Sequence, residues 1–240
     1  MTRALGLTIE EAPRDLVALP AKLLSCRQID QVDAQLAQAL GLDVERHVSA
    51  GLVTCDSDDA LYVALDQATK FAEVDVVFGR SFYAGARHSS GPFSGEILGI
   101  VAGAHPGHVA EALWKIREGL HDGICFHTFA GESQPAFFAY VLSETGRYLA
   151  PQAKLEPGAP MAYLIAPPLE SVVGVDAALK AAKVTLAKHL PPPSETNFGG
   201  AFLAGELPEL EAAAVAFVEA IRSIAHSPLA ALRRPSRLRR

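Results

Sequence analysis

The chain has 240 residues, half of them hydrophobic, and a formal net charge of −6 at pH 7. This length is enough for two small domains that each bury a core, and the negative charge argues against a general nucleic-acid-binding protein. No stretch approaches the roughly 20 apolar residues of a membrane span, and the three widely spaced cysteines predict a reduced, cytoplasmic protein without a disulfide framework.

The first predicted elements, in chain order, alternate between strand and helix. The apolar run Leu61–Leu65 predicts a short buried strand. We expect a short helix to begin at Asp66, because a carboxylate at a helix N-terminus accepts unpaired backbone N–H groups. A core strand is predicted over Glu96–Ala102, and Gly103 and Pro106 then predict a turn into a second helix. This helix gathers its apolar residues on one face, namely Val109, Leu113, Ile116 and Leu120.

The same order of elements recurs in the second half of the chain. The pattern D-x-A-x-K-x-A-x-V occurs at Asp66–Val74 and again at Asp176–Val184, where Asp176 is also expected at a helix N-terminus. Strands are predicted over Ala162–Ala166 and Gly200–Ala204. The last helix has an apolar face made of Leu210, Ala214, Phe217, Ile221 and Ile224. A repeat of about 100 residues indicates a duplicated α/β domain, not a solenoid.

These motifs resemble the domain of bacterial microcompartment shell proteins. The repeated D-x-A-x-K pattern, the glycine-turned strand and the closing helix are similar to that domain. The strings Gly79-Arg80-Ser81, Tyr83-Ala84-Gly85-Ala86 and Pro191 to Asn197 resemble tandem-domain members of the ethanolamine-utilisation type. The resemblance implies an α/β, ferredoxin-like fold of two circularly permuted domains, at residues 1–123 and 124–228, before a basic tail at 229–240. It also implies a structural protein and not an enzyme.

The resemblance further implies how the chain assembles. Members of this kind form a homotrimer with a pseudo-sixfold outline, which tiles beside hexameric and pentameric shell proteins of a microcompartment in the cytoplasm. Two similar domains in one chain supply two similar edges, and three chains around an axis supply six. Lys70 and Lys180 match the family's lysine at the edge between tiles, although an exposed helix lysine with a weak ion pair would look the same.

A small channel in each subunit is the second implied feature. Carboxylates around a narrow passage favour a small cation such as protonated ethanolamine. For Asp56, Asp58 and Asp59, a turn whose side chains bond their own backbone is an equally good interpretation. The residues that match the family's channel or ligand site are Asp58, Asp59, Tyr83, Glu96, Phe126, Glu170, Glu195 and Thr196.

Two departures from the family pattern bear on the ligand. Arg87 stands where a small residue is usual, which puts the selectivity for cations in question. The stretch Phe126–Phe129 lacks a nearby tryptophan, which weakens cobalamin as an alternative pore ligand. The N-terminus is longer than in the family. Small metabolites remain the expected ligands, with no cofactor required and no nucleic-acid or membrane partner.

Enzyme motifs are not recognisable in the sequence. The glycine-rich segment Gly85–Gly91 lacks the Lys-Ser/Thr ending of a phosphate-binding loop, and no serine sits in a G-x-S-x-G turn. The histidines lack metal-ligand spacing and are predicted on the surface, at His105, His108, His121 and His127. The alternative function is a soluble, oligomeric small-molecule sensor on the same duplicated fold, because a fold alone does not decide function.

Overall fold

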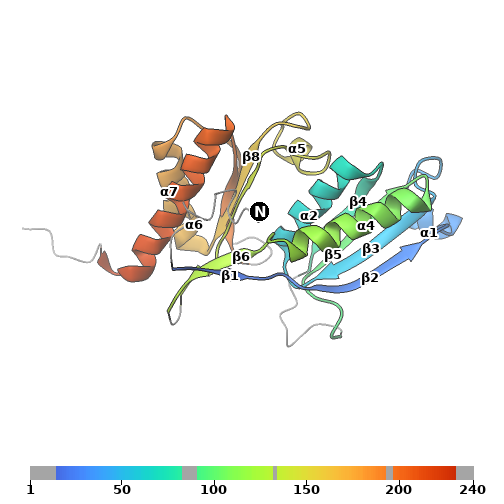
Figure 1. The fold of residues 1–240 in the computed structure, drawn as a ribbon, viewed down its shortest axis with the longest axis horizontal. Helices are drawn as coiled ribbons and strands as arrows, with labels where there is room; N and C mark the ends of the chain where they lie inside the picture. The colour runs from blue at the N-terminus through green and yellow to red at the C-terminus, as the bar shows by residue number, and fades with distance from the viewer. Residues whose placement is uncertain (1–14, 83–90, 132–133, 193–196, 231–240) are drawn as a thin grey trace, which may run out of the picture.

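The computed structural model describes residues 15–82, 91–131, 134–192 and 197–230. Two four-stranded sheets and one two-stranded sheet make up the strands of this described part (Figure 1). Both larger sheets are antiparallel throughout. Among the helices described, none is both long and apolar enough to cross a membrane.

The duplication predicted from the sequence is confirmed in the order of the elements. Module 1 contains β2 (Leu23–Ile29), α1 (Ala34–Ala39), β3 (Ser49–Cys55), α2 (Asp58–Phe71), β4 (Asp75–Ser81), β5 (Ile97–Gly103) and α4 (Pro106–His121). Module 2 contains β7 (Phe138–Leu142), α5 (Leu149–Gln152), β8 (Met161–Ala166), α6 (Pro168–Ala181), β9 (Thr185–Leu190), β10 (Gly199–Ala204) and α7 (Leu207–His226). The strand orders, β2-β3-β5-β4 and β7-β8-β10-β9, are equivalent. Each module is a ferredoxin-like unit whose last strand has moved to the front of its chain order.

One predicted strand is wrong. Leu61–Leu65 lies inside the helix α2, and the buried strand of module 1 is β3. Asp58 and Asp59 in the first turn favour the helix, and the buried positions Leu61, Leu65 and Ala68 then recur at helical spacing. A short apolar run does not distinguish a buried strand from a buried helix segment. The matching prediction in module 2, over Ala162–Ala166, is confirmed by β8.

The predicted role of the two repeated aspartates is also wrong. Asp66 lies well inside α2, and Asp176 lies well inside α6, so neither is at a helix N-terminus. Asp176 is exposed and pairs with Lys180 one turn later, at 2.6 Å. Asp66 is fully buried and serves the other module instead.

The carboxylate of Asp66 holds the turn that leads into α5. Its two oxygens accept backbone N–H groups from Gly146 at 2.6 Å, Leu149 at 2.7 Å and Tyr148 at 3.1 Å. This close approach requires glycine at position 146, because a Cβ would lie 2.2 Å from the main-chain oxygen of Asp66. We call this contact between α2 and residues 144–149 the seam. Figure 1 shows α2 and α5 facing each other between the two modules.

One more side chain contributes hydrogen bonds to the seam, and the apolar core continues across it. Arg147 donates to the main-chain oxygens of Ala72 and Val74, at 3.2 and 2.9 Å. One hydrophobic cluster contains Leu61 and Leu65 from module 1 together with Phe138, Tyr163 and Phe202 from module 2. The modules therefore share a core, and a second cluster lies under α6 and α7.

A two-stranded ribbon joins the N-terminal segment to module 2. β1 (Leu16–Leu19) pairs antiparallel with β6 (Phe126–Phe129), so that Leu19 lies opposite Phe126. Asp15 pairs with Arg222 of α7 at 3.1 Å. The division of the chain at residues 123 and 124 stays a prediction.

Replacement of Asp66 by alanine should destabilise the protein. The change leaves three backbone N–H groups of the seam without their acceptor, two of them in buried hydrogen bonds, and we expect the free energy of unfolding to fall by about 3 kcal/mol. Chemical denaturation measures this loss. Asp122→Ala removes an exposed aspartate after α4 and should change the value by less than about 0.5 kcal/mol. Equal effects of the two variants would contradict the role of Asp66.

Candidate functional site

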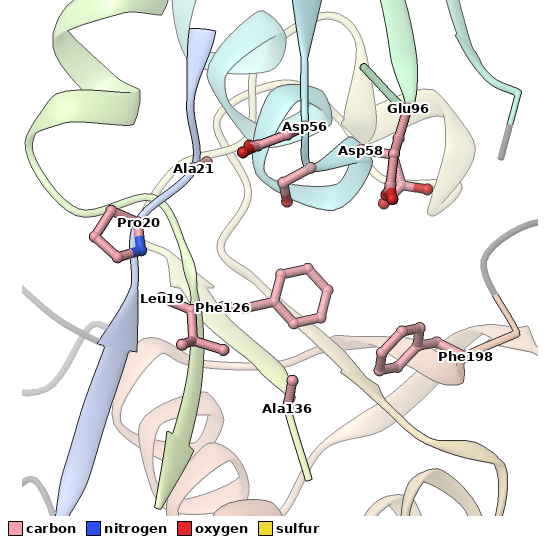
Figure 2. Close-up of a pocket in the computed structure, with 10 residues that line it drawn as sticks. Leu19, Pro20, Ala21, Asp56, Asp58, Glu96, Phe126, Ala136 and Phe198 are labelled. Carbon is pink, nitrogen blue, oxygen red and sulfur yellow. The ribbon is translucent and has the colours of Figure 1, made fainter. Parts of the chain in front are cut away.

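A cavity of about 270 Å³ lies where the β1–β6 ribbon meets the N-terminal end of α2. Figure 2 shows the carboxylates of Asp56, Asp58 and Glu96 on one side of it and the rings of Phe126 and Phe198 on the other. We call it the acidic cavity. Its lining residues are Leu19, Pro20, Ala21, Asp56, Ser57, Asp58, Glu96, Phe126, Ala136 and Phe198.

The backbone at the end of β3 brings the three carboxylates together. Glu96 donates its N–H to the main-chain oxygen of Cys55 at 2.8 Å, which places it beside the residues that follow Cys55. This approach requires Gly95, which has φ +63° and whose Cβ would lie 2.1 Å from that same oxygen. Asp56 accepts the N–H of Lys22 at 2.7 Å, so the chain leading into β2 closes the cavity from another side.

Crowding of like charges marks the site electrostatically. The pKa of Glu96 is raised, chiefly by burial and further by the charges of Asp58 and Asp56. A neighbouring cation would relieve this repulsion, and so the site favours positive charge. Within the described residues, no cluster of three or more His, Cys, Asp or Glu side chains is arranged to hold a metal ion. The charge of a small organic cation would offset this repulsion.

The aromatic side of the acidic cavity suits the apolar part of such a ligand. The rings of Phe126 and Phe198 meet edge to face, with centroids 5.6 Å apart. Phe126 also packs on the buried Phe138 at 5.3 Å, which fixes its orientation. Ring faces attract cations as well as apolar groups. Carboxylates opposite phenyl rings can thus hold a small alkylammonium ion.

The structure brings together only some of the residues predicted for the channel. Asp58, Glu96 and Phe126 line the acidic cavity. Asp59 lines a neighbouring cavity, and Glu170 lies in the first turn of α6 and lines neither one. The other predicted residues, Tyr83, Glu195 and Thr196, lie outside the described residues, as does Arg87.

Sequence reasoning missed the ribbon side of the site. Leu19, Pro20 and Ala21 belong to a strand and turn that the sequence analysis did not assign, and Phe198 went unnoticed next to the Pro191–Asn197 string. The apolar run Leu16–Leu19 is only four residues long and does not alternate with polar residues, which is too short a signal to predict a strand.

One predicted surface histidine is buried. His127 lies in β6 with 3% of its surface exposed, while His105 and His121 are exposed. Burial lowers the pKa of His127 to about 4, so the ring is neutral near pH 7. Its ring stacks on that of Phe137, with centroids 6.3 Å apart.

The two predicted edge lysines differ in their surroundings. Lys70 donates to the main-chain oxygen of Glu144 at 2.9 Å, so it takes part in the seam. Lys180 is exposed and pairs with Asp176 of its own helix. Both lie in the last turn of a helix, where a cation also meets the negative end of the helix dipole.

Comparison with known proteins gives consistent matches over most of the chain, although no protein-family model matches it. The bacterial microcompartment shell protein EutL of Escherichia coli is 46% identical over 204 residues, which cover 85% of this chain and 92% of that protein. The crystal structure of EutL from Clostridium perfringens has a TM-score of 0.86 and 42% identity and covers 90% of this chain and 98% of that one. The ethanolamine utilization protein EutL from Leptotrichia buccalis has a TM-score of 0.85 and 43% identity, with 89% and 98% covered.

Proposed function

The chain belongs to the EutL family of bacterial microcompartment shell proteins, and from this premise we propose that it forms a homotrimeric tile whose acidic cavity takes up small organic cations. The observation that carries the proposal is that one face of α2 is buried in module 1, whereas the equivalent face of α6 in module 2 is exposed. The relatives named above are shell proteins, which supports a structural role over a catalytic one. Hexameric and pentameric shell proteins are the proposed neighbours of the tile.

The seam between the modules supplies a template for contacts between chains. Val63 and Asp66 on α2 are fully buried by module 2 and by the shared core. At the equivalent positions of α6, Val173 is 44% exposed and the side chain of Asp176 is 61% exposed. A helix that is covered in one copy and bare in the other lacks its partner in the single chain.

The bare face of α6 is apolar and lies far from the element that would cover it. Leu169 and Val172 are 60% and 54% exposed, next to Val173. In module 1, α1 follows β2, just as α5 follows β7 in module 2, so α1 is the counterpart of α5. Figure 1 places α1 at one end of the long axis, and α6 with α7 at the other. A head-to-tail contact between α6 and the α1 region of a second copy therefore repeats the seam, and such contacts generate a ring when the rotation closes. Six modules in the ring correspond to three chains.

Charge on the α6 face should break the trimer into single chains. In the double variant Leu169→Asp, Val173→Asp, two carboxylates would be buried in each contact between chains, which costs several kcal/mol. Light scattering should report about three times the 25.4 kDa of the chain for the unaltered protein and one chain for the variant. Trp114→Asp alters an equally exposed residue of α4 and should leave the trimer intact. A single chain in every case would overturn the trimer.

Lys180 is proposed to act at the edge between neighbouring tiles. Its side chain is 74% exposed, and a weak ion pair with Asp176 leaves it able to move to another partner. Lys70 is less available for a contact between tiles, because it already donates to the main-chain oxygen of Glu144 within the chain. The two edges of the tile are therefore chemically unequal.

Lys180→Ala should weaken the assembly of sheets and spare the trimer. Loss of one hydrogen bond or ion pair is worth about 1 kcal/mol per contact, which is too little to dissociate a trimer but is multiplied across a lattice. Electron microscopy of concentrated protein shows whether sheets form, and Lys183→Ala is the exposed control nearby. Sheets of unchanged extent in the Lys180 variant would show that this lysine has no role at the edge. A discrete oligomer under all conditions would instead support a sensor.

Uptake of a cation by the acidic cavity should depend on Glu96 and on pH. The pKa of Glu96 is raised, so its charge is lost on acidification at a higher pH than for an ordinary glutamate. Affinity for ethanolamine hydrochloride, measured by calorimetry, should fall as the pH passes down through that raised pKa. Glu96→Gln should weaken binding about threefold to tenfold near pH 7 and remove this step in the pH profile. Glu73→Gln, at a side chain that is 90% exposed, serves as control. No heat at millimolar ethanolamine would disprove uptake.

A further inference from the structure

A second cavity, of about 290 Å³, lies beside the acidic cavity on the α5 side of α2. Three tyrosines line it, together with Gln152 and Lys188, and we call it the tyrosine cavity. Its room depends partly on Gly79 of β4, where a Cβ would come within 2.5 Å of the Tyr148 hydroxyl. Asp58 lines both cavities, so the first turn of α2 is the wall between them.

This wall contains two carboxylates, those of Asp58 and Asp59. Asp58 accepts the N–H of Asp59 at 2.8 Å, and Asp59 accepts a short hydrogen bond from the hydroxyl of the buried Tyr163. Burial and the charges of the two aspartates raise the pKa of Tyr163 well above its usual value, so the phenol stays a donor. A cation at either side of the wall meets the same negative charge.

Lys188 makes the two sides of the wall electrostatically different. It comes from β9, lies opposite Phe202 in the sheet register, and its ammonium stands over the Phe202 ring, 5.3 Å from the centroid. The equivalent position in module 1 is Phe78, which lies opposite Ile100. The fold itself therefore does not require a charge here. Among the described residues, the lining of the acidic cavity contains the carboxylates of Asp56, Asp58 and Glu96 and no basic side chain, whereas the lining of the tyrosine cavity contains Lys188 as well as two carboxylates.

We propose that the tyrosine cavity is a second site for small organic cations beside the acidic cavity, and that Lys188 sets which cations occupy it. The proposal rests on the proposed function, in which the acidic cavity takes up cations. A fixed ammonium repels a dication twice as strongly as a monocation, because the Coulomb energy is proportional to the ligand charge. The tyrosine hydroxyls and Gln152 can hydrogen-bond a hydroxyl on the ligand. The tyrosine cavity accordingly favours a monovalent amino alcohol over a diamine.

Removal of the lysine charge should change the two ligand classes by different factors. We choose ethanolamine hydrochloride as the monocation and 1,3-diaminopropane dihydrochloride as the dication, both titrated by calorimetry into the full-length protein. Lys188→Met should strengthen binding of ethanolamine about threefold and that of the diamine about tenfold, since doubling the charge doubles the free-energy change. Lys188→Gln, which keeps a polar side chain, should show the same ratio. Lys183→Met removes an equal charge from an exposed site and should leave both affinities within twofold.

The outcomes separate this inference from the function on which it rests. Binding of ethanolamine that is weakened by Glu96→Gln but unaffected by both Lys188 variants would leave cation uptake standing and overturn the role of Lys188. An equal gain for both ligands would also overturn it, because charge would then not be the cause. Absence of any binding, in the unaltered protein and in all variants, would remove the proposed uptake and this inference together.

Discussion

A single buried carboxylate decides how the two halves of this molecule meet. Asp66 accepts three backbone N–H groups from the start of α5 and the turn before it, and backbone N–H groups in a protein interior require an acceptor. The turn thereby fixes α5 and the neighbouring strands against α2, and α2 is the element whose first turn supplies Asp58 and Asp59. Both cavities lie along this one helix, so their shapes follow from the same contact.

The sequence was sufficient for the architecture and insufficient for the contact that organises it. A pattern repeated in the same order predicted two copies of one α/β unit, because a sequence repeat can be recognised without knowing which residues are in contact in the folded protein. Leu61–Leu65 was misassigned because its apolar character is the same in a buried strand and a buried helix. Asp66 was placed at a helix start, since its actual partners lie some eighty residues further along the chain, and no local rule connects them.

The candidate site was only partly predictable for the same reason. Asp58, Glu96 and Phe126 were found through motifs, but Leu19 and Phe198 reach the cavity through pairing of the ribbon and through packing between modules. Neither residue belongs to a local pattern that indicates a ligand. The proposed role of Lys188 could not be predicted from the sequence either, because it depends on carboxylates of module 1 that line the same cavity.

Duplication within one chain has a consequence for how such a shell protein can change. In a ring of six identical subunits, any substitution appears at all six boundaries at once. Here Asp58 and Asp59 start α2, while Pro168 and Leu169 stand at the equivalent places of α6, so one boundary is acidic and hollow and the other is apolar. In the proposed trimer, the loss of sixfold repetition would let mutations change three boundaries for permeability while the other three are selected for cohesion alone.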